Sequence, residues 1–367
     1  MPIPTSRDYD DLRIRVERWL DRHHPGVEVG ALAAPEGSGY SSETVLFDAS
    51  YVVDGSPEHR SYVARLEPEP GDVPVFPSYD LELQYRCMTA VREHSAVPVP
   101  VAPWFEPDPE PLGSPFFIME RIDGRVPSDN PPYTFEGWLF DAPAAERREI
   151  QRSFFRILAD IHRIDVSTAD LGFLDRPDFG HTALDQELGY QQWFYDWVRD
   201  GVEYPVIEAM FDWLDDNRPD PGNRRVLSWG DSRIGNVMWR GTEPVAVLDW
   251  EMAALGEPEA DVAWQLHIHR FFTWVAGVLG IPPLDGLFER ADAVADYETA
   301  SGLRLRDVDY YEVLAGLRFG IISIRVKMRE IAVGNDTQPD TADGLCMTAP
   351  LLYGMLDGSY FDGATFT

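Results

Sequence analysis

Three polar side chains of one short stretch of the chain, Leu227 to Glu251, could do chemistry together: the carboxylates of Asp231 and Asp249 and the carboxamide of Asn236. Asp231 is followed five residues later by Asn236, and thirteen residues after that by Asp249. Apolar runs fill the intervening sequence, which predicts short strands that each end at one of these polar side chains. Turn and cap residues can produce the same spacing, but two acids and an amide are more than a turn requires.

These side chain types suit the transfer of a phosphoryl group to a hydroxyl. Such a reaction needs a carboxylate beside the nucleophile, a cation that neutralises phosphate charge, and a loop that covers the phosphates. We expect Asp231 to orient the hydroxyl and accept its proton. We expect Asn236 and Asp249 to hold Mg²⁺, which favours oxygen ligands and is bound by few protein groups besides substrate phosphates.

Composition narrows the class of protein and the partners. The chain has 367 residues with 44% apolar content, which is enough for two globular lobes. Its formal net charge of −32 argues against a nucleic-acid backbone or an anionic membrane as partner, and is compatible with a cationic substrate. Two cysteines without paired or metal-type spacing, and the lack of a signal peptide pattern, predict a cytoplasmic protein.

The pattern of apolar residues changes near residue 120. Before it, we expect mainly strands and turns, with one helix at 78–94. After Arg121 we expect mainly helices, with the short strands of 226–250 among them. The helices are predicted at about 143–164, 184–199, 203–216, 257–279, 285–300 and 308–331.

This change predicts an α+β chain with two lobes. The smaller lobe, at 1–120, is rich in β-strands, and the larger lobe, at 121–367, is mainly helical. A connector near 119–124 joins them. The most apolar stretch, 271–281, is too short to span a bilayer and predicts a buried helix.

Two blocks, WGDSRIGNVMW and AVLDWEMAALGEPEADVAW, resemble the catalytic core of the aminoglycoside phosphotransferase-like family, which has the protein-kinase-like fold. The closer resemblance is to the phosphotransferase-type domain associated with certain acyl-CoA dehydrogenases. The segments EGSGYSSETVLFD, YVARLEP, VPVPVAPW and PFFIMERIDGRV extend it over about residues 25 to 330. The resemblance implies a phosphotransferase that uses ATP or GTP with Mg²⁺. It also implies a catalytic role for Asp231 and metal-binding roles for Asn236 and Asp249.

The same resemblance assigns the nucleotide to the first lobe. The loop at 36–44 would cover the phosphates, because its glycines allow close backbone approach and its hydroxyls donate, although a short glycine pair also suits a plain hairpin turn. Arg65 takes the place of the usual strand lysine, and a guanidinium can bind phosphate through two donors. Backbone groups of the connector would meet the base. The predicted nucleotide-binding residues are Gly37, Ser38, Gly39, Ser41, Ser42, Arg65, Met119, Glu120 and Ile122.

Two departures from the family pattern leave alternatives open. Trp229 stands where the family often has histidine, and we expect it to alter packing rather than chemistry. Gln84 stands where a glutamate usually pairs with the strand cation, while Glu82 lies two residues earlier. A second hypothesis is therefore a catalytically weak or inactive kinase-like protein that binds nucleotide or a small ligand. A metal-dependent hydrolase is a third, but it leaves the glycine loop and the connector unexplained.

Several other polar residues are expected to be structural. Asp261 resembles the aspartate that braces the catalytic loop from the start of a helix. His162 lies on an apolar helix and is expected to be hydrogen-bonded in the core. His267 and His269 are two residues apart on a helix and point in different directions, which disfavours a zinc pair.

The acceptor is expected to be a hydroxylated small molecule, either aminoglycoside-like or of hydroxyacyl type. The net negative charge suits a polycation, whereas an anionic CoA thioester would need a local arginine cluster. The helix at 189–204 carries aromatic side chains that suit either the core or the wall of a substrate cleft, namely Tyr190, Trp193, Phe194 and Trp197. The arginines that could form such a cluster for a CoA thioester also fit a solvated helix face, and they are Arg147, Arg148, Arg152 and Arg156.

Overall fold

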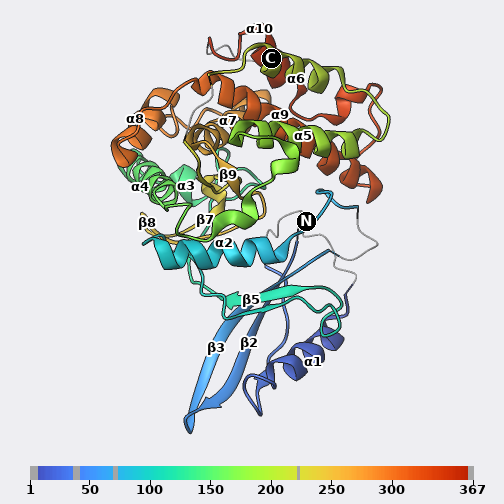
Figure 1. Ribbon diagram of the computed structural model, residues 1–367, viewed down its shortest axis with the longest axis vertical. Coiled ribbons are helices and arrows are strands. Elements are labelled where there is room, and N and C mark those ends of the chain that lie inside the picture. Colours follow the sequence, from blue (N-terminus) through green and yellow to red (C-terminus); the bar gives the residue numbers. More distant parts are fainter. Residues whose placement is uncertain (1–6, 36–41, 69–72, 221–223, 363–367) are drawn as a thin grey trace.

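An antiparallel sheet with strand order β1-β2-β3-β5-β4 lies at one end of the molecule (Figure 1). The structure is a computed structural model that describes residues 7–35, 42–68, 73–220 and 224–362. The strands of this sheet are β1 (Glu28–Val29), β2 (Glu43–Val53), β3 (Ser56–Leu66), β4 (Trp104–Glu106) and β5 (Phe116–Glu120).

The long hairpin of β2 and β3 positions Arg65. A tight turn at Asp54 and Gly55 joins the two strands, and both residues have the positive φ angles, 50° and 78°, that such turns need. Strand pairing then places Arg65 opposite Thr44 on β2 and opposite Phe117 on β5. Arg65 consequently lies near the end of β3, at the edge of the sheet lobe.

Helix α2 (Leu81–His94) lies between the sheet and the helical lobe (Figure 1). It begins after Asp80, whose carboxylate accepts a hydrogen bond from the backbone N–H of Leu83 at 2.8 Å. A second helix, α1 (Tyr9–Leu20), packs on the sheet lobe beside β2 and β3.

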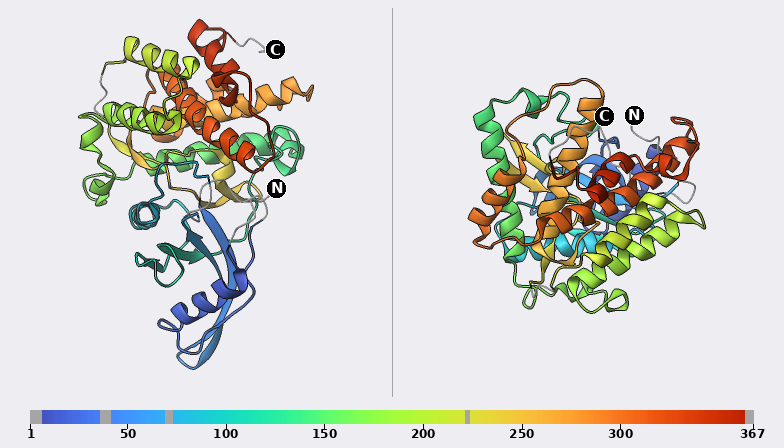
Figure 2. Two further views of the ribbon diagram at one scale, coloured as in Figure 1. Left: turned by 90° about the vertical axis from the view of Figure 1, so that its right-hand side faces the viewer. Right: turned by 90° about the horizontal axis from the view of Figure 1, so that it is seen from above.

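The larger lobe is built from helices around two short antiparallel strand pairs (Figure 2). Strand β6 (Val226–Ser228) pairs with β9 (Ala254–Gly256), and β7 (Val237–Arg240) pairs with β8 (Glu243–Val247). The α-helices are α3 (Trp138–Asp141), α4 (Ala144–His162), α5 (Ala183–Arg199), α6 (Pro205–Asp216), α7 (Pro258–Val278), α8 (Arg290–Ser301), α9 (Val308–Ala332) and α10 (Ala349–Asp357). Short 3₁₀ turns occur at η1 (Leu171–Leu174), η2 (Pro177–Phe179), η3 (Ile234–Asn236) and η4 (Ala342–Leu345).

The described residues form two hydrophobic clusters. The smaller one joins α1 to one face of the sheet. The larger one fills the helical lobe and also contains the apolar side chains of α2, including Leu81, Met88 and Val91. The position of α2 is therefore fixed mainly by packing against the helical lobe, which orders the junction between the lobes.

The predicted α+β class with a small sheet lobe and a larger helical part is confirmed. The predicted helices occur, although the one expected at 285–300 begins only at Arg290. Helices α1, α3 and α10 were not predicted. The prediction of a buried helix at 271–281 was wrong at its end, where Val278 and Leu279 are 59% and 62% exposed. Among the described residues, no helix is long and apolar enough to cross a membrane.

Candidate active site

The two predicted metal ligands are brought together by the β7–β8 hairpin. Asn236 immediately precedes β7, and Asp249 follows β8 by two residues. The N–H of Leu248 donates to the carbonyl of Asn236 at 2.9 Å, which closes the hairpin at that end. Asp231 lies in the loop between β6 and β7, so one compact segment supplies all three predicted side chains.

Asp231 is buried, and three side chains fix its carboxylate. Trp264 Nε1 donates to Oδ1 at 2.7 Å, and Asn236 Nδ2 donates to Oδ2 at 2.7 Å. Arg233 Nε lies 3.1 Å from Oδ1 and 3.0 Å from Oδ2. These three donors hold the carboxylate in a single orientation.

The side chains of Asn236 and Asp249 fit a hard cation. The Asn236 amide nitrogen is occupied by Asp231, which leaves the amide oxygen as a ligand. Burial raises the pKa of Asp249, the Arg65 guanidinium opposes the rise, and the Asp231 carboxylate adds to it. A bound cation would favour the ionised form. Within the described residues no group of three or more His, Cys, Asp or Glu side chains suits a metal, so phosphate oxygens would have to complete the coordination.

Arg65 contacts Asp249 and makes no ion pair with helix α2. Its Nη2 lies 3.5 Å from Asp249 Oδ1, and its Nη1 donates to Thr44 Oγ1 at 3.0 Å. Gln84 on α2 is buried and its Nε2 has no hydrogen-bond partner among the described residues, whereas Glu82 is exposed. Neither α2 side chain therefore pairs with Arg65, and Asp249 is its carboxylate partner.

Asp261 braces the catalytic loop, as predicted. It is fully buried in the first turn of α7 and accepts hydrogen bonds from the N–H groups of Trp229 and Gly230, at 2.8 and 2.9 Å. Ser228 Oγ donates at 2.8 Å, and His162 Nε2 donates at 2.9 Å. Burial by itself would raise the pKa of Asp261, but these hydrogen bonds, that of His162 foremost, lower it below its ordinary value.

Two further residues of α7 hold the same loop and were not predicted. Trp264, three residues after Asp261, donates to the Asp231 carboxylate, and Gln265 Oε1 accepts from the N–H of Ile234 at 2.7 Å. Residues three and four apart share one face of a helix, so all three side chains point at the loop. The spacing D-x-x-W-Q was the available sequence signal.

Trp229 does more than alter packing, which corrects the sequence expectation. Its indole N–H lies 2.9 Å from the carbonyl oxygen of Leu248 and 3.1 Å from that of Asp249. Asp249 has a φ of 60°, a conformation that costs a non-glycine residue free energy. The indole therefore holds the backbone of a metal-ligand candidate in a strained conformation.

Arg233 is the other important residue that the sequence reasoning missed. Besides Asp231, it forms an ion pair with Asp129 through Nη1. Burial alone would lower the pKa of Arg233, but the carboxylates of Asp129 and Asp231 raise it. Its position two residues after Asp231, inside the recognised motif, was the only signal.

Part of the predicted nucleotide site lies outside the described residues, namely Gly37, Ser38, Gly39 and Ser41. Ser42 is buried, and its hydroxyl has no hydrogen-bond partner in the described part of the chain. In the connector, the Glu120 N–H donates to the Val101 carbonyl at 2.8 Å. Met119 is 9% exposed, within the core cluster, and Ile122 is partly buried. The Glu120 N–H is therefore already engaged and is not available to the edge of a nucleotide base.

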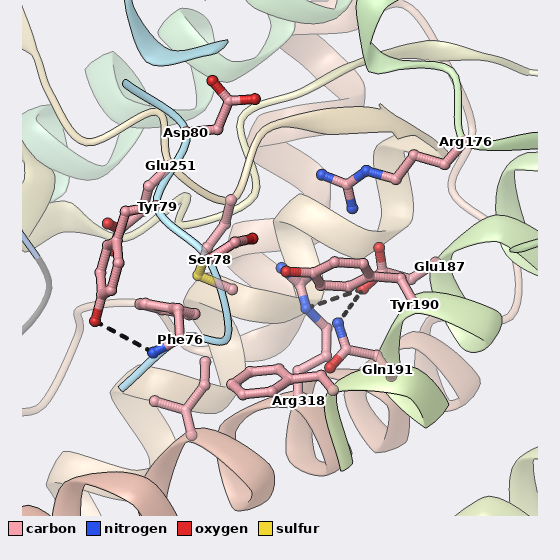
Figure 3. A pocket seen from close by; sticks show the side chains of 13 residues that line it. Phe76, Ser78, Tyr79, Asp80, Arg176, Glu187, Tyr190, Gln191, Glu251 and Arg318 are labelled. Carbon is pink, nitrogen blue, oxygen red and sulfur yellow. Dashed lines mark hydrogen bonds and ion pairs between the residues drawn. The ribbon is translucent and has the colours of Figure 1, made fainter. Parts of the chain in front are cut away.

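A pocket of about 520 Å³, counting the part open to solvent, lies beside the catalytic loop (Figure 3). Arg318 links the two, because it lines the pocket and its Nη2 donates to the Gly230 carbonyl at 3.1 Å. Met252, another lining residue, packs so closely on Gly230 that an added Cβ would lie 2.0 Å from the Met252 carbonyl oxygen. Of the aromatic residues on α5, Tyr190 and Phe194 line the pocket.

The other secondary expectations have clear outcomes. His162 is a hydrogen-bonded core residue, with its Nδ1 2.7 Å from the Tyr297 hydroxyl. His269 contacts the Tyr133 hydroxyl at 2.8 Å, whereas neither ring nitrogen of His267 has a hydrogen-bond partner within the described part of the chain, so the two histidines share no partner there. The arginines of the candidate cluster on helix α4 contact other protein groups. Arg148 pairs with Asp296 on α8, and the others contact Glu149 or backbone carbonyls.

The sequence model of the family described as Phosphotransferase enzyme family matches residues 35–303, which is well over half of the chain. The chain belongs to this family. It is 27% identical over 72% of its length to the Arabidopsis thaliana protein named Probable acyl-CoA dehydrogenase IBR3, and covers 32% of that protein. It is 24% identical over 87% of its length to Acyl-CoA dehydrogenase family member 11 of Homo sapiens, and covers 38% of it. The chain thus spans about a third of the length of these curated relatives.

Solved structures show the same fold. A Ralstonia eutropha JMP134 protein assigned as an aminoglycoside phosphotransferase has a TM-score of 0.65 at 24% identity, over 95% of this chain and 98% of that one. A mutant of aminoglycoside phosphotransferase APH(4)-Ia, in complex with ADP and hygromycin B, has a TM-score of 0.54 at 16% identity, over 95% and 99% of the chains. A GDP and kanamycin complex of APH(2")-IIia has a TM-score of 0.55 at 12% identity, over 96% and 100%. Family and fold together support a nucleotide-dependent small-molecule phosphotransferase.

Replacing Asp261 with alanine should lower the free energy of unfolding by about 3–5 kcal/mol, because it leaves buried donors and His162 without their partner. The carboxylate has a lowered pKa in the folded state, so its contribution is complete above the ordinary value of 3.8 and is lost as the pH falls further. Urea unfolding from pH 7 to pH 3 measures both. Asp212→Ala, an exposed helical aspartate, is the control and should change stability by less than about 0.5 kcal/mol.

Replacing Trp229 with phenylalanine should keep the aromatic packing but remove the indole N–H from the two carbonyls. We expect a loss of about 1 kcal/mol in unfolding free energy and a several-fold weaker magnesium-dependent binding of nucleotide. Trp239→Phe is the matched control, because Trp239 is also fully buried but its Nε1 makes no hydrogen bond to any residue that the structure describes. Equal effects of the two substitutions on nucleotide binding, measured by calorimetry, would contradict the role given to Trp229.

Proposed function

We propose that the protein transfers the γ-phosphoryl group of ATP or GTP to a hydroxyl of a small molecule. The observation that carries the proposal is the fixed, buried carboxylate of Asp231 beside Asn236, with Asp249 on the same hairpin. We also propose residues 1–120 as the nucleotide-binding lobe and 121–367 as the catalytic and substrate-binding lobe.

The residues of this chain would act mainly by positioning and charge. Asp231 is held in one orientation by its hydrogen bonds, so it would orient the acceptor hydroxyl and accept its proton during the transfer. The hydroxyl oxygen forms a bond to the γ-phosphorus as the bond to the bridging oxygen breaks, which releases ADP or GDP. Arg233, next to Asp231, would hold that carboxylate in place while the charge moves.

Asn236 and Asp249 would hold Mg²⁺, which when bound neutralises charge on the nucleotide phosphates. Arg65 would turn from Asp249 toward the phosphates or bridge both, and Gly37, Ser38, Gly39, Ser41 and Ser42 would cover them. Neighbours crystallised with ADP and with GDP support the use of a nucleotide.

The acceptor would be a hydroxylated compound, aminoglycoside-like or of hydroxyacyl type. The net charge of −32 supports a small-molecule partner and not a nucleic acid or an anionic membrane. The two cysteines are free and buried, which supports the cytoplasm as the place of action.

The test is a thermal-shift titration with ATP and GTP, with and without Mg²⁺, followed by an assay of nucleoside diphosphate release with hydroxylated acceptors. The melting temperature should rise with nucleotide concentration, and the magnesium-dependent part should vanish in Asp249→Ala. Asp231→Asn should lower transfer by more than about a hundredfold while nucleotide binding stays within a few-fold, because Asp231 contacts the acceptor. Absence of any shift in the wild type would reject the proposal.

The second candidate is a kinase-like binding protein without turnover. It is favoured by one observation, the pairing of Arg65 with Asp249 in place of an α2 glutamate. Nucleotide binding in the wild type, with release rates equal in wild type and Asp231→Asn for every acceptor, would establish this alternative.

A further inference from the structure

The pocket beside the catalytic loop holds two arginines that differ in their partners. Arg318 is neutralised, because its Nε lies 3.1 Å from Glu187 Oε1. Arg176 has no carboxylate within 4.0 Å among the described residues. Its guanidinium carbon lies 4.3 Å from the centre of the Tyr190 ring, and its Nη2 makes one long contact, 3.4 Å, to the Ala253 carbonyl.

The acids of the pocket are already engaged or lie away from Arg176. Glu187 also accepts a hydrogen bond from Gln191 Nε2 at 3.0 Å. Asp80 caps α2. Glu251 lies beside Tyr79, on the opposite side of the pocket from Arg176 (Figure 3). Of the two arginines that line the pocket, Arg176 is therefore the one without a carboxylate partner among the described residues.

The position of Arg176 is fixed independently of its charge. Its backbone N–H donates to Gln186 Oε1 at 3.1 Å, and Gln186 Nε2 in turn donates to Asp175 Oδ1 at 2.7 Å. The backbone of Arg176 is held by Gln186, and its guanidinium group lies over the Tyr190 ring. The N–H donors along the edge of the guanidinium group therefore remain for a ligand. A planar fork of this kind matches a carboxylate.

We propose that Arg176 binds a carboxylate of the phosphoryl acceptor. The acceptor is then a hydroxylated monoanion with an apolar body, which would lie against Phe76, Tyr190 and Phe194. A polycation would instead place an ammonium group against Arg176, which has no carboxylate partner among the described residues. This inference rests on the proposed phosphotransferase function, and it names the class of substrate for that site.

The test uses three probes of equal chain length that differ in charge: 6-hydroxyhexanoate, its neutral amide, and 6-aminohexan-1-ol. Calorimetric titration of the full chain should show that the carboxylate binds about tenfold more tightly than the amide, with the amine weakest. Arg176→Gln should abolish the preference, and Arg176→Lys should restore part of it, because lysine keeps the charge but not the fork.

Arg86→Gln is the matched control. Its guanidinium also lies over an aromatic ring, 3.9 Å from the centre of Phe173, but outside the pocket. The control should retain the full preference for the carboxylate. Equal or reversed preference in the wild type, retention of the preference in Arg176→Gln, or no saturable binding of any probe would each overturn the inference.

Failure of this inference is distinguishable from failure of the proposed function. Probe binding is measured without nucleotide, and nucleotide binding is measured without probe. Magnesium-dependent nucleotide binding with transfer to 6-aminohexan-1-ol in preference to the carboxylate would keep the phosphotransferase and reject the carboxylate site. Carboxylate preference without nucleotide binding would keep the Arg176 site and reject the phosphotransferase.

Discussion

The candidate site depends on one constraint, the hydrogen bonds by which helix α7 fixes the loop between β6 and β7. Asp261, Trp264 and Gln265 lie on one face of the helix and each hydrogen-bonds the loop between β6 and β7. The Asp261 carboxylate stays ionised in a fully buried place only because several donors surround it. The loop is consequently positioned before any ligand arrives, which is what transfer by orientation and charge requires.

Arginine performs nearly all the cationic roles in this chain, and its geometry shapes the site. Arg233 spans two carboxylates, Arg65 spans Thr44 and Asp249, and Arg318 spans Gly230 and Glu187. A planar guanidinium can bridge two acceptors at once, whereas an ammonium group cannot hold both in a fixed plane. These contacts join the loop between β6 and β7 to Asp249 and to the pocket, and Arg176 remains as a pocket arginine without a carboxylate partner among the described residues.

The sequence predicted what depends on local pattern, and missed what depends on tertiary pairing. Helix periodicity predicted α4 to α7 and α9 closely. The spacing of Asp231, Asn236 and Asp249 identified three side chains that lie in one compact segment, with the last two at the same end of the β7–β8 hairpin. The contact of Trp229 with the carbonyl of Asp249 could not be read from spacing, because it joins residues twenty positions apart through the backbone of a strained residue. The exposure of Val278 and Leu279 was missed because apolar composition alone does not say which end of a helix leaves the core.

The most direct test of the central claim is a crystal structure with Mn²⁺ in place of Mg²⁺ and a non-hydrolysable ATP analogue, with the metal located by its anomalous scattering. The account predicts a metal bound by Asn236 Oδ1, an Asp249 carboxylate oxygen and nucleotide phosphate oxygens, with Asp231 still hydrogen-bonded to Trp264 and facing the γ-phosphate. A metal bound elsewhere, or a nucleotide whose γ-phosphate points away from Asp231, would contradict it.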